Sequence, residues 1–293
     1  MELSPLGMSI GDLLFEGAEY LASKEIEEPS LNSKILLSHT LGLEGDDLLF
    51  RLQRAASAES AERYWGYLRR RGAGEPVQYI RGKVYWLDLD LVVESGVFIP
   101  RPETETLLEA VVNSLKRRGE AHRPLVVLDI GTGSGNIAIA LARQLEEATV
   151  YASDISLSAL RVARQNIRLN GVAERVHCLE GDSLKPFRRR KMVDLIVSNP
   201  PYVRTRELRE LPVEVRGYEP RFTLDGGRDG LRLTRRLLEG APDLLKDKGM
   251  LALELGPGQG EEVKGIAASQ GIFKNLRIVR DLSGKERVAL MEL

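Results

Sequence analysis

The first part of the chain has apolar residues at helical spacing. Up to about residue 72 they recur every three or four positions, as Ile10, Leu13 and Leu21 do. This period predicts short amphipathic helices that bury one face against each other. Serine side chains accept hydrogen bonds from the first free N–H groups of helices, so we expect Ser9 and Ser30 to cap two of them.

The apolar period changes near residue 84. Leu89 and Leu91 alternate with Asp88 and Asp90, which predicts one half-buried strand over residues 84–93. A Ser-Gly pair follows and is typical of a turn. We therefore expect a returning strand at residues 97–99, and we interpret this hairpin as a linker.

From residue 125 onwards, short apolar strands alternate with amphipathic helices, which favours a parallel α/β sheet. We expect strands at residues 125–130, 150–153, 176–179, 195–199 and 250–255, and a final hairpin from residues 276–279 and 287–291. The sequence thus predicts three parts: a helical domain over residues 1–83, a β-hairpin linker over residues 84–100 and an α/β domain over residues 101–293.

Composition narrows the class of protein. The 293 residues include 42 basic and 43 acidic side chains and carry a net charge of -1, so no basic field favours direct nucleic-acid binding. The only cysteine, Cys178, excludes an intrachain disulfide and favours a reducing compartment. The three histidines lack metal-ligand spacing, so we expect no metal. We see neither a signal-peptide pattern nor a membrane-spanning apolar run, and we expect a cytoplasmic protein without membrane contact.

The most informative stretch is the motif Asn199-Pro200-Pro201-Tyr202, which ends an apolar strand. Two prolines remove two backbone donors, so the strand ends in acceptors: the side-chain oxygen of Asn199 and the carbonyl of Pro200. These acceptors could hold a planar NH2 group, and the ring of Tyr202 could cover its face. Ligands of open α/β sheets bind beyond the carboxyl ends of the strands, where this motif is expected. The simpler alternative is a strand followed by a proline turn.

A glycine-rich loop follows the strand at residues 125–130. The pattern Asp129-x-Gly131-x-Gly133-x-Gly135 differs from the dinucleotide fingerprint, because its third glycine comes one position early. A carboxylate at Asp129 is unfavourable beside a pyrophosphate but suits an ammonium group. The following helix N-terminus suits a carboxylate. S-adenosylmethionine carries both groups, and we predict it as the cofactor.

Acidic residues at two further strand ends support a nucleoside cofactor. Asp154 lies 21 residues after Gly133, where an acid binds ribose hydroxyls in nucleotide-binding sheets. Asp182 could meet the adenine amino group, although either acid could instead cap a helix. We expect the cofactor to be lined by the loop and by residues near these strand ends, namely Asp129, Gly131, Thr132, Gly133, Ser134, Gly135, Asp154, Ile155, Asp182, Ser183 and Asn199.

Together these features resemble the class I S-adenosylmethionine-dependent methyltransferases, and more closely the HemK/PrmC family, the glutamine methyltransferases of peptide chain release factors. The resemblance covers nearly the whole chain. The matching motifs are Pro76-Val77-Gln78-Tyr79-Ile80-x-Gly82, Phe98-Ile99-Pro100-Arg101-Pro102-Glu103-Thr104-Glu105, the glycine loop, Asn199-Pro200-Pro201-Tyr202, Glu219-Pro220, Gly226-Gly227-x-Asp229-Gly230-Leu231 and Glu254-Leu255-Gly256.

The resemblance implies a fold, a substrate and a set of site residues. It implies a Rossmann-like sheet of seven mostly parallel strands and an amino-terminal helical domain that binds the release factor. It also implies methyl transfer to the side-chain amide of the glutamine in the Gly-Gly-Gln motif. The catalytic residues would be Asn199, Pro200 and Tyr202, and the substrate would contact Phe98, Arg101, Glu103, Asn199, Pro200, Pro201 and Tyr202.

Three other functions stay open at the level of the sequence. A nucleic-acid amino methyltransferase could present the same acceptors to the NH2 group of a flipped base, although the near-zero charge disfavours it. A ribosomal-protein glutamine methyltransferase would use nearly the same chemistry. A non-catalytic S-adenosylmethionine-binding adaptor would not need the acceptor motif.

Overall fold

The computed structural model describes residues 8–44, 46–188 and 190–293. The first residues, in which the sequence shows no signal-peptide pattern, lie outside this range. Two compact units are present. The first comprises the residues up to Gly82 together with Pro212–Tyr218, and the second comprises Lys83–Leu211 and Glu219–Leu293. The predicted hairpin thus belongs to the second unit, and the roles assigned to the parts stay predictions.

The first unit is helical. Its core joins Leu13, Leu36, Tyr64 and Leu68, all fully buried. Its helices are α1 (Ile10–Ser23), α2 (Pro29–Leu41), α3 (Ala58–Gly72), α4 (Val77–Arg81) and the short α8 (Val213–Arg216), with a 3-10 turn at Leu49–Arg51.

The structure confirms one of the two predicted helix caps. Ser9 caps α1 in a capping box with Asp12. The prediction for Ser30 is wrong, because α2 begins at Pro29 and its N-cap is Glu28, at φ 49°. Proline favours the first position of a helix, so this helix begins one residue before the expected cap.

The hairpin is present, but its predicted strands are wrong. Strand β1 (Lys83–Trp86) pairs antiparallel with β2 (Leu89–Val92), so the turn falls inside the single strand expected over residues 84–93. Residues 97–99 form no strand. Leu87 has a φ of 53° in the turn, a conformation that a leucine rarely adopts.

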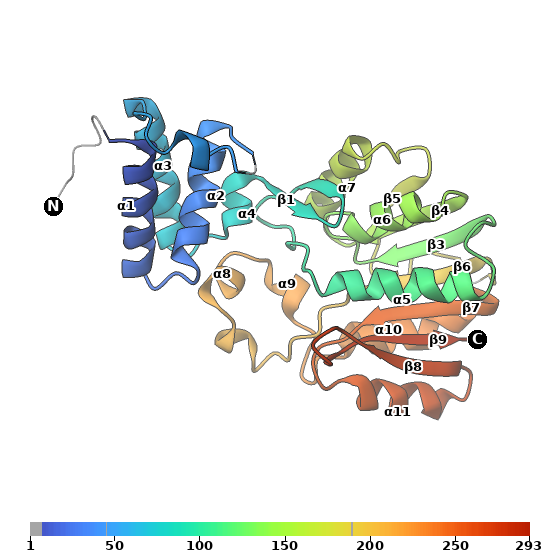
Figure 1. Cartoon of the computed structure of the whole chain (residues 1–293). Coiled ribbons are helices and arrows are strands. Elements are labelled where there is room, and N and C mark those ends of the chain that lie inside the picture. The colour runs from blue at the N-terminus through green and yellow to red at the C-terminus, as the bar shows by residue number, and fades with distance from the viewer. Residues whose placement is uncertain (1–7, 45, 189) are drawn as a thin grey trace. The chain divides into compact units, whose positions relative to one another are not determined.

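A seven-stranded sheet is the centre of the second unit, as predicted (Figure 1). Its order is β5-β4-β3-β6-β7-β9-β8, and β9 is antiparallel to both of its neighbours. The strands are β3 (Leu125–Ile130), β4 (Ala148–Asp154), β5 (Val176–Glu180), β6 (Val193–Ser198), β7 (Leu245–Glu254), β8 (Lys274–Arg280) and β9 (Glu286–Glu292).

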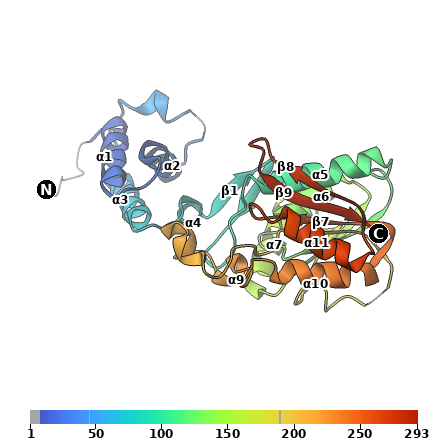
Figure 2. The same cartoon turned by 90° about the horizontal axis from the view of Figure 1, so that it is seen from below.

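Helices cover both faces of this sheet (Figure 2). On β3, Val127 joins one apolar cluster and Leu128 joins the other, because successive side chains point to opposite faces. The first cluster includes the hairpin and α5 (Thr104–Arg117), α6 (Asn136–Gln144) and α7 (Leu157–Leu169). The second includes α10 (Arg232–Gly240), the turn Ala241–Asp243 and α11 (Gly260–Gln270). The short α9 (Arg221–Leu224) and a 3-10 turn at Leu208–Glu210 lie in the segment between β6 and α10.

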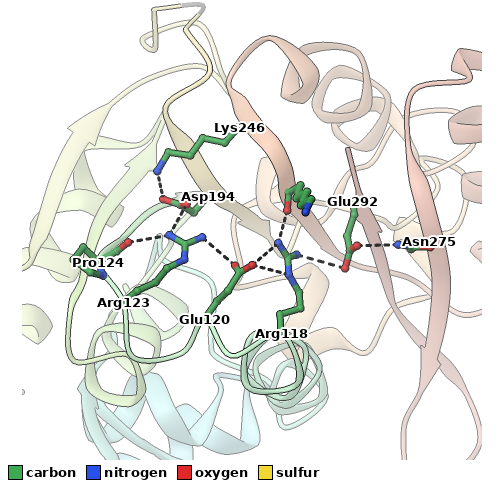
Figure 3. A network of polar contacts seen from close by, with 9 residues as sticks. Arg118, Glu120, Arg123, Pro124, Asp194, Lys246, Asn275 and Glu292 are labelled. Carbon is green, nitrogen blue, oxygen red and sulfur yellow. Dashed lines mark hydrogen bonds and ion pairs between the residues drawn. The ribbon is translucent and has the colours of Figure 1, made fainter.

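A network of charges ties the amino-terminal ends of three central strands together (Figure 3). The buried carboxylate of Asp194, on β6, accepts bonds from Arg123 (2.9 Å), from Lys246 on β7 (2.7 Å) and from the N–H of Val126 on β3 (2.9 Å). Burial raises the pKa of Asp194, but these bonds outweigh it and lower the pKa overall. The network therefore stabilises the end of the sheet that lies opposite the predicted site.

Candidate active site

The predicted cofactor and acceptor motifs meet at the carboxyl ends of β3 and β6. These strands are parallel neighbours, with Asp129 opposite Val197. The hydroxyl of Ser198 donates to the carbonyl of Ile130 at 2.7 Å and fixes the two strand ends to each other. The chain turns from β3 to β4 on one side, while β6 lies on the other. This is the topological switch point at which open α/β sheets bind ligands.

The glycine loop forms an open cradle between β3 and α6. The N–H groups of Gly131 and Thr132 both donate to the carbonyl of Ser153, on β4. Gly131 and Gly133 have positive φ angles of 75° and 56°. A Cβ added at either position would meet no atom within 4 Å. These glycines therefore serve the turn and leave space over the loop, as a bound ligand requires.

Asp129 places an unsatisfied carboxylate oxygen beneath this loop. The residue is completely buried. Its Oδ2 accepts a bond from the Thr132 hydroxyl at 2.6 Å, while its Oδ1 has no partner among the described residues. Burial raises the pKa of Asp129 to about 7, and the nearby Asp154 charge adds to this rise. The Thr132 hydroxyl and, more weakly, the backbone N–H of Ala138 lower the pKa. An ammonium group fits this site, because it would satisfy the oxygen and stabilise the ionised form.

The two other predicted acids have different environments. The oxygens of the buried Asp154 accept from the N–H groups of Gly133 and Ser156, both at 2.9 Å, and burial raises its pKa. Asp182 instead pairs with Lys185 (2.6 Å) and Arg236 (2.8 Å), and these bonds lower its pKa.

Of the two residues that follow these acids, one is exposed and one is buried. Ile155 is 61% exposed. Ser183 is buried at a φ of 58°, and its hydroxyl has no hydrogen-bond partner within the part of the chain that the structure describes.

The Asn-Pro-Pro-Tyr loop rests on the glycine-rich segment that precedes α10. A Cβ on Gly226 would lie 2.5 Å from the carbonyl oxygen of Pro201, and one on Gly230 would collide with that of Tyr202. Gln259 also donates to the Tyr202 carbonyl, at 3.1 Å. Burial raises the pKa of Tyr202 to about 12, so its ring presents a neutral, largely apolar surface. Close backbone contact thus explains why glycines occupy this motif.

Asn199 is bonded through its amide nitrogen. Its Nδ2 donates to the hydroxyl of Thr104 at 3.1 Å, and this hydroxyl donates to Glu254 at 2.7 Å. Because Nδ2 donates to Thr104, Oδ1 is the atom of this amide that remains to accept a hydrogen bond from a substrate. Thr104 and Glu254 lie within two of the motifs that carry the family resemblance, but the sequence did not predict that either residue belongs to the site.

The predicted substrate residues between the hairpin and α5 are engaged with the protein itself. Arg101 pairs with the buried Glu219, and its guanidinium lies 5.0 Å from the ring centre of Phe98. Glu219 also accepts from the N–H of Ile99 at 3.3 Å. Glu103 pairs with Arg287 at 3.5 Å. These contacts fix the loop that carries Phe98, and they explain the glutamate of the Glu219-Pro220 motif.

The sheet order and the cradle define the class I S-adenosylmethionine-dependent methyltransferase fold. Residues 89–213 match the family model for the methyltransferase small domain. The fold is similar to that of a methyltransferase from Pyrococcus furiosus (TM-score 0.51, 19% identity, 70% of this chain and 89% of that one). It is also similar to the hMettl16 catalytic domain in complex with MAT2A 3′UTR hairpin 6 (TM-score 0.55, 14% identity, 79% and 81%).

Sequence relatives give the particular family. Residues 12–82 match the model for the PrmC N-terminal domain. The release factor glutamine methyltransferase of Moorella thermoacetica is 42% identical over 97% of this chain and 98% of that protein. The protein of the same name from Geobacter sulfurreducens is 41% identical over 92% and 91%. The chain belongs to the release factor glutamine methyltransferase family.

Two further observations concern ligands and membranes. Among the residues that the structure describes, no three His, Cys, Asp or Glu side chains gather as a metal-binding group. In the same part of the chain, no helix is both long and apolar enough to cross a bilayer.

Proposed function

We propose that this protein transfers a methyl group from S-adenosylmethionine to the side-chain amide nitrogen of a glutamine in peptide chain release factors. The observation that carries the proposal is the orientation of Asn199 at the end of β6. Its NH2 group is bound by Thr104, so its oxygen is available to a donor. Membership of the family supports the substrate, because the relatives are named for this reaction.

Three features of the chain suit the cofactor. The unpartnered Oδ1 of Asp129 would accept a bond from its ammonium group. Asp154, at the end of β4, would accept from the ribose hydroxyls, in addition to its two backbone bonds. The open space above Gly131 and Gly133 allows a ligand to approach the backbone. When bound, the cofactor supplies an electrophilic methyl group on a sulfonium.

The reaction needs the protein to hold a weak nucleophile in position. An amide nitrogen attacks poorly, because its lone pair is delocalised into the carbonyl group. Two N–H bonds, to Asn199 Oδ1 and to the Pro200 carbonyl, would orient the nitrogen and meet the positive charge that develops on it. Tyr202 would cover the flat face of the amide, with Phe98 on the loop beside it. The transfer breaks the bond between the sulfonium and its methyl group and leaves S-adenosylhomocysteine, and the methylated nitrogen would then lose one proton to water to restore the neutral amide.

We assign recognition of the intact release factor to the helical first unit and methyl transfer to the second. The support is that all the residues discussed for the cofactor and the amide lie in the second unit. We propose the cytoplasm as the compartment, since a single cysteine suits a reducing environment.

Kinetics of two Asn199 variants test the acceptor mechanism. With a purified release factor as substrate, Asn199→Ala should lower kcat by about 100- to 1,000-fold, as the loss of one preorganised polar contact does elsewhere. Asn199→Asp keeps an acceptor oxygen and should retain more activity than Asn199→Ala. Cofactor affinity should change much less in both. If Asn199→Ala turns over like the parent, the motif is only a proline turn.

A further inference from the structure

A buried chain of hydrogen bonds leads from the proposed acceptor to a carboxylate that the mechanism above does not use. It runs from Asn199 Nδ2 through the hydroxyl of Thr104 to Oε2 of Glu254. Thr104 and Glu254 are each only 1% exposed. Thr104 is the first residue of α5, and Glu254 is the last residue of β7, directly after the residue paired with Ser198. These hydrogen bonds thus link the start of α5 to the carboxyl ends of the neighbouring strands β6 and β7, where the site lies.

The direction of these bonds follows from the donors that each group has. A hydroxyl has a single proton, and an ionised carboxylate accepts only. The proton of Thr104 is therefore directed to Glu254, and the hydroxyl can offer only a lone pair to Asn199. An asparagine side chain turned by 180° would bring its own oxygen against that lone pair. Only one of the two amide orientations is compatible with the ionised Glu254.

We propose that Thr104 and Glu254 are positioning residues that set the orientation of the Asn199 amide, so that its Oδ1 faces the substrate N–H. The inference rests on the proposed function, in which this oxygen is the acceptor. Neither residue touches the reacting atoms. They act through Asn199: with its amide reversed, the Thr104 hydroxyl could not keep its charge-assisted hydrogen bond to Glu254 and also bond to Asn199.

The charges around Glu254 add a dependence on pH. Burial raises the pKa of Glu254 to about 7 and the Glu103 charge adds to this rise, while the Thr104 hydroxyl, the Arg287 charge and a hydrogen bond from the Asn199 side chain lower it. Arg287 is itself paired with Glu103 and with Asp281, at 3.5 and 2.8 Å. A protonated Glu254 could donate to Thr104, whose own proton would then be free to turn toward Asn199.

The orientation should therefore be best defined above pH 7. Tyr202 stays neutral throughout this range, because its pKa is about 12, so it does not contribute to the change.

Three single variants test the positioning role. Thr104→Val keeps the shape but removes the hydroxyl, and it should lower kcat on a release factor by about 10- to 100-fold, in the range that misplaced catalytic groups cause. Cofactor affinity should stay within about twofold of the parent. Thr104→Ser restores the hydroxyl and should recover most of the loss. Thr234→Val, at an equally buried threonine on α10, controls for loss of any buried hydroxyl.

Two further kinetic results separate positioning from a general structural effect. In an Asn199→Ala background, Thr104→Val should cause no additional loss, because its only route of action is gone. At saturating cofactor, the parent kcat should fall about tenfold from pH 8 to pH 6, and Thr104→Val should remove this fall. An equal loss in both backgrounds, an unchanged pH profile, or full activity of Thr104→Val would each overturn the inference.

A spectroscopic measurement tests the same bond without any release factor. In protein labelled with 15N-asparagine, the side-chain signal of Asn199 is the one that Asn199→Ala removes. Its NH2 protons should exchange slowly with water in the parent and in Thr104→Ser, and faster in Thr104→Val. Equal exchange in all three would refute the bond. If the parent methylates no release factor, the proposed function fails, yet this measurement still decides the orientation.

Discussion

Cofactor binding should release protons near neutral pH, and Asp129 should be their source. In the free protein this buried carboxyl has a pKa of about 7, and its Oδ1 has no partner among the described residues. An ammonium group placed on that oxygen would favour the ionised form and lower the pKa. Because the bound state then holds fewer protons than the free state, binding and proton release are linked.

The pKa of about 7 sets the size of the effect. Half of the Asp129 side chains are protonated at pH 7, so binding should release about 0.5 proton per site. At pH 6 the release should approach about 0.9 proton, and at pH 8 it should fall to about 0.1. Affinity should follow the ionised fraction and be about tenfold weaker at pH 6 than at pH 8.

Calorimetry with S-adenosylhomocysteine measures this directly. This product carries the ammonium and carboxylate groups but no sulfonium charge, so it reports on Asp129 rather than on charges near the methyl group. The binding enthalpy, measured in buffers of different ionisation enthalpy at each pH, gives the number of protons released.

Two variants identify the source of the protons. Asp129→Asn should abolish the release, whereas Glu254→Gln should keep it, although Glu254 also has a pKa raised to about 7. Proton release that is absent, or that survives in Asp129→Asn, would show that Asp129 does not bind the ammonium group.

Four other outcomes follow from the structure. Asp154→Ala should weaken S-adenosylhomocysteine binding by about 1.5–3 kcal/mol through loss of a charge-assisted ribose contact; unchanged affinity in calorimetry would remove Asp154 from the site. Gly230→Ala should displace the Tyr202 carbonyl and lower kcat by about 10- to 100-fold with little change in cofactor affinity, and kinetics equal to the parent would contradict the packing argument. Asp194→Ala should lower the free energy of unfolding in urea by about 2–3 kcal/mol. Because the folded-state pKa of Asp194 is lowered, this difference should be full above about pH 4 and shrink as the pH falls further; a constant difference would exclude ionisation as the cause. A chain that starts at Lys83 should bind cofactor like the parent but lose most of its kcat/KM on the intact release factor, and equal values would reject the docking role of the first unit.

Local patterns predicted much of the fold. The bounds expected for β3, residues 125–130, agree with the structure to the residue. This strand is an apolar run with a clear boundary, because the glycine loop follows it directly.

The strands predicted for the hairpin were wrong for an identifiable reason. Its turn lies at Leu87 and Asp88, and both residues fit the alternation of apolar and polar residues that continues through β2. Leu87 is not a turn-forming residue, and Asp88, although aspartate is common in turns, takes the same polar place in the alternation as Asp90 in the strand. Alternation alone therefore could not distinguish one strand of ten residues from two strands of four.

The candidate site was predictable where one segment supplies the chemistry. The acceptor motif, the glycine loop and Asp154 each end a strand, and the rules for parallel sheets bring such ends together. The hydrogen bonds that hold the Asn199 side chain were not predictable in this way. Thr104 and Glu254 are 150 residues apart, and each fits its own segment without the other, as a helix start and as a strand end. Their bond follows only from the packing of α5 against the sheet.

The proposed reaction places the methyl group on a glutamine side-chain amide of a release factor. The direct measurement is mass spectrometry of a purified release factor after incubation with the protein and methyl-labelled S-adenosylmethionine. We expect one added methyl group per release-factor chain, on the side-chain nitrogen of the glutamine in the Gly-Gly-Gln motif, and none when Asn199→Ala is used for the same short time. Methylation of another residue type, or of a nucleic acid while the release factor stays unmodified, would contradict it.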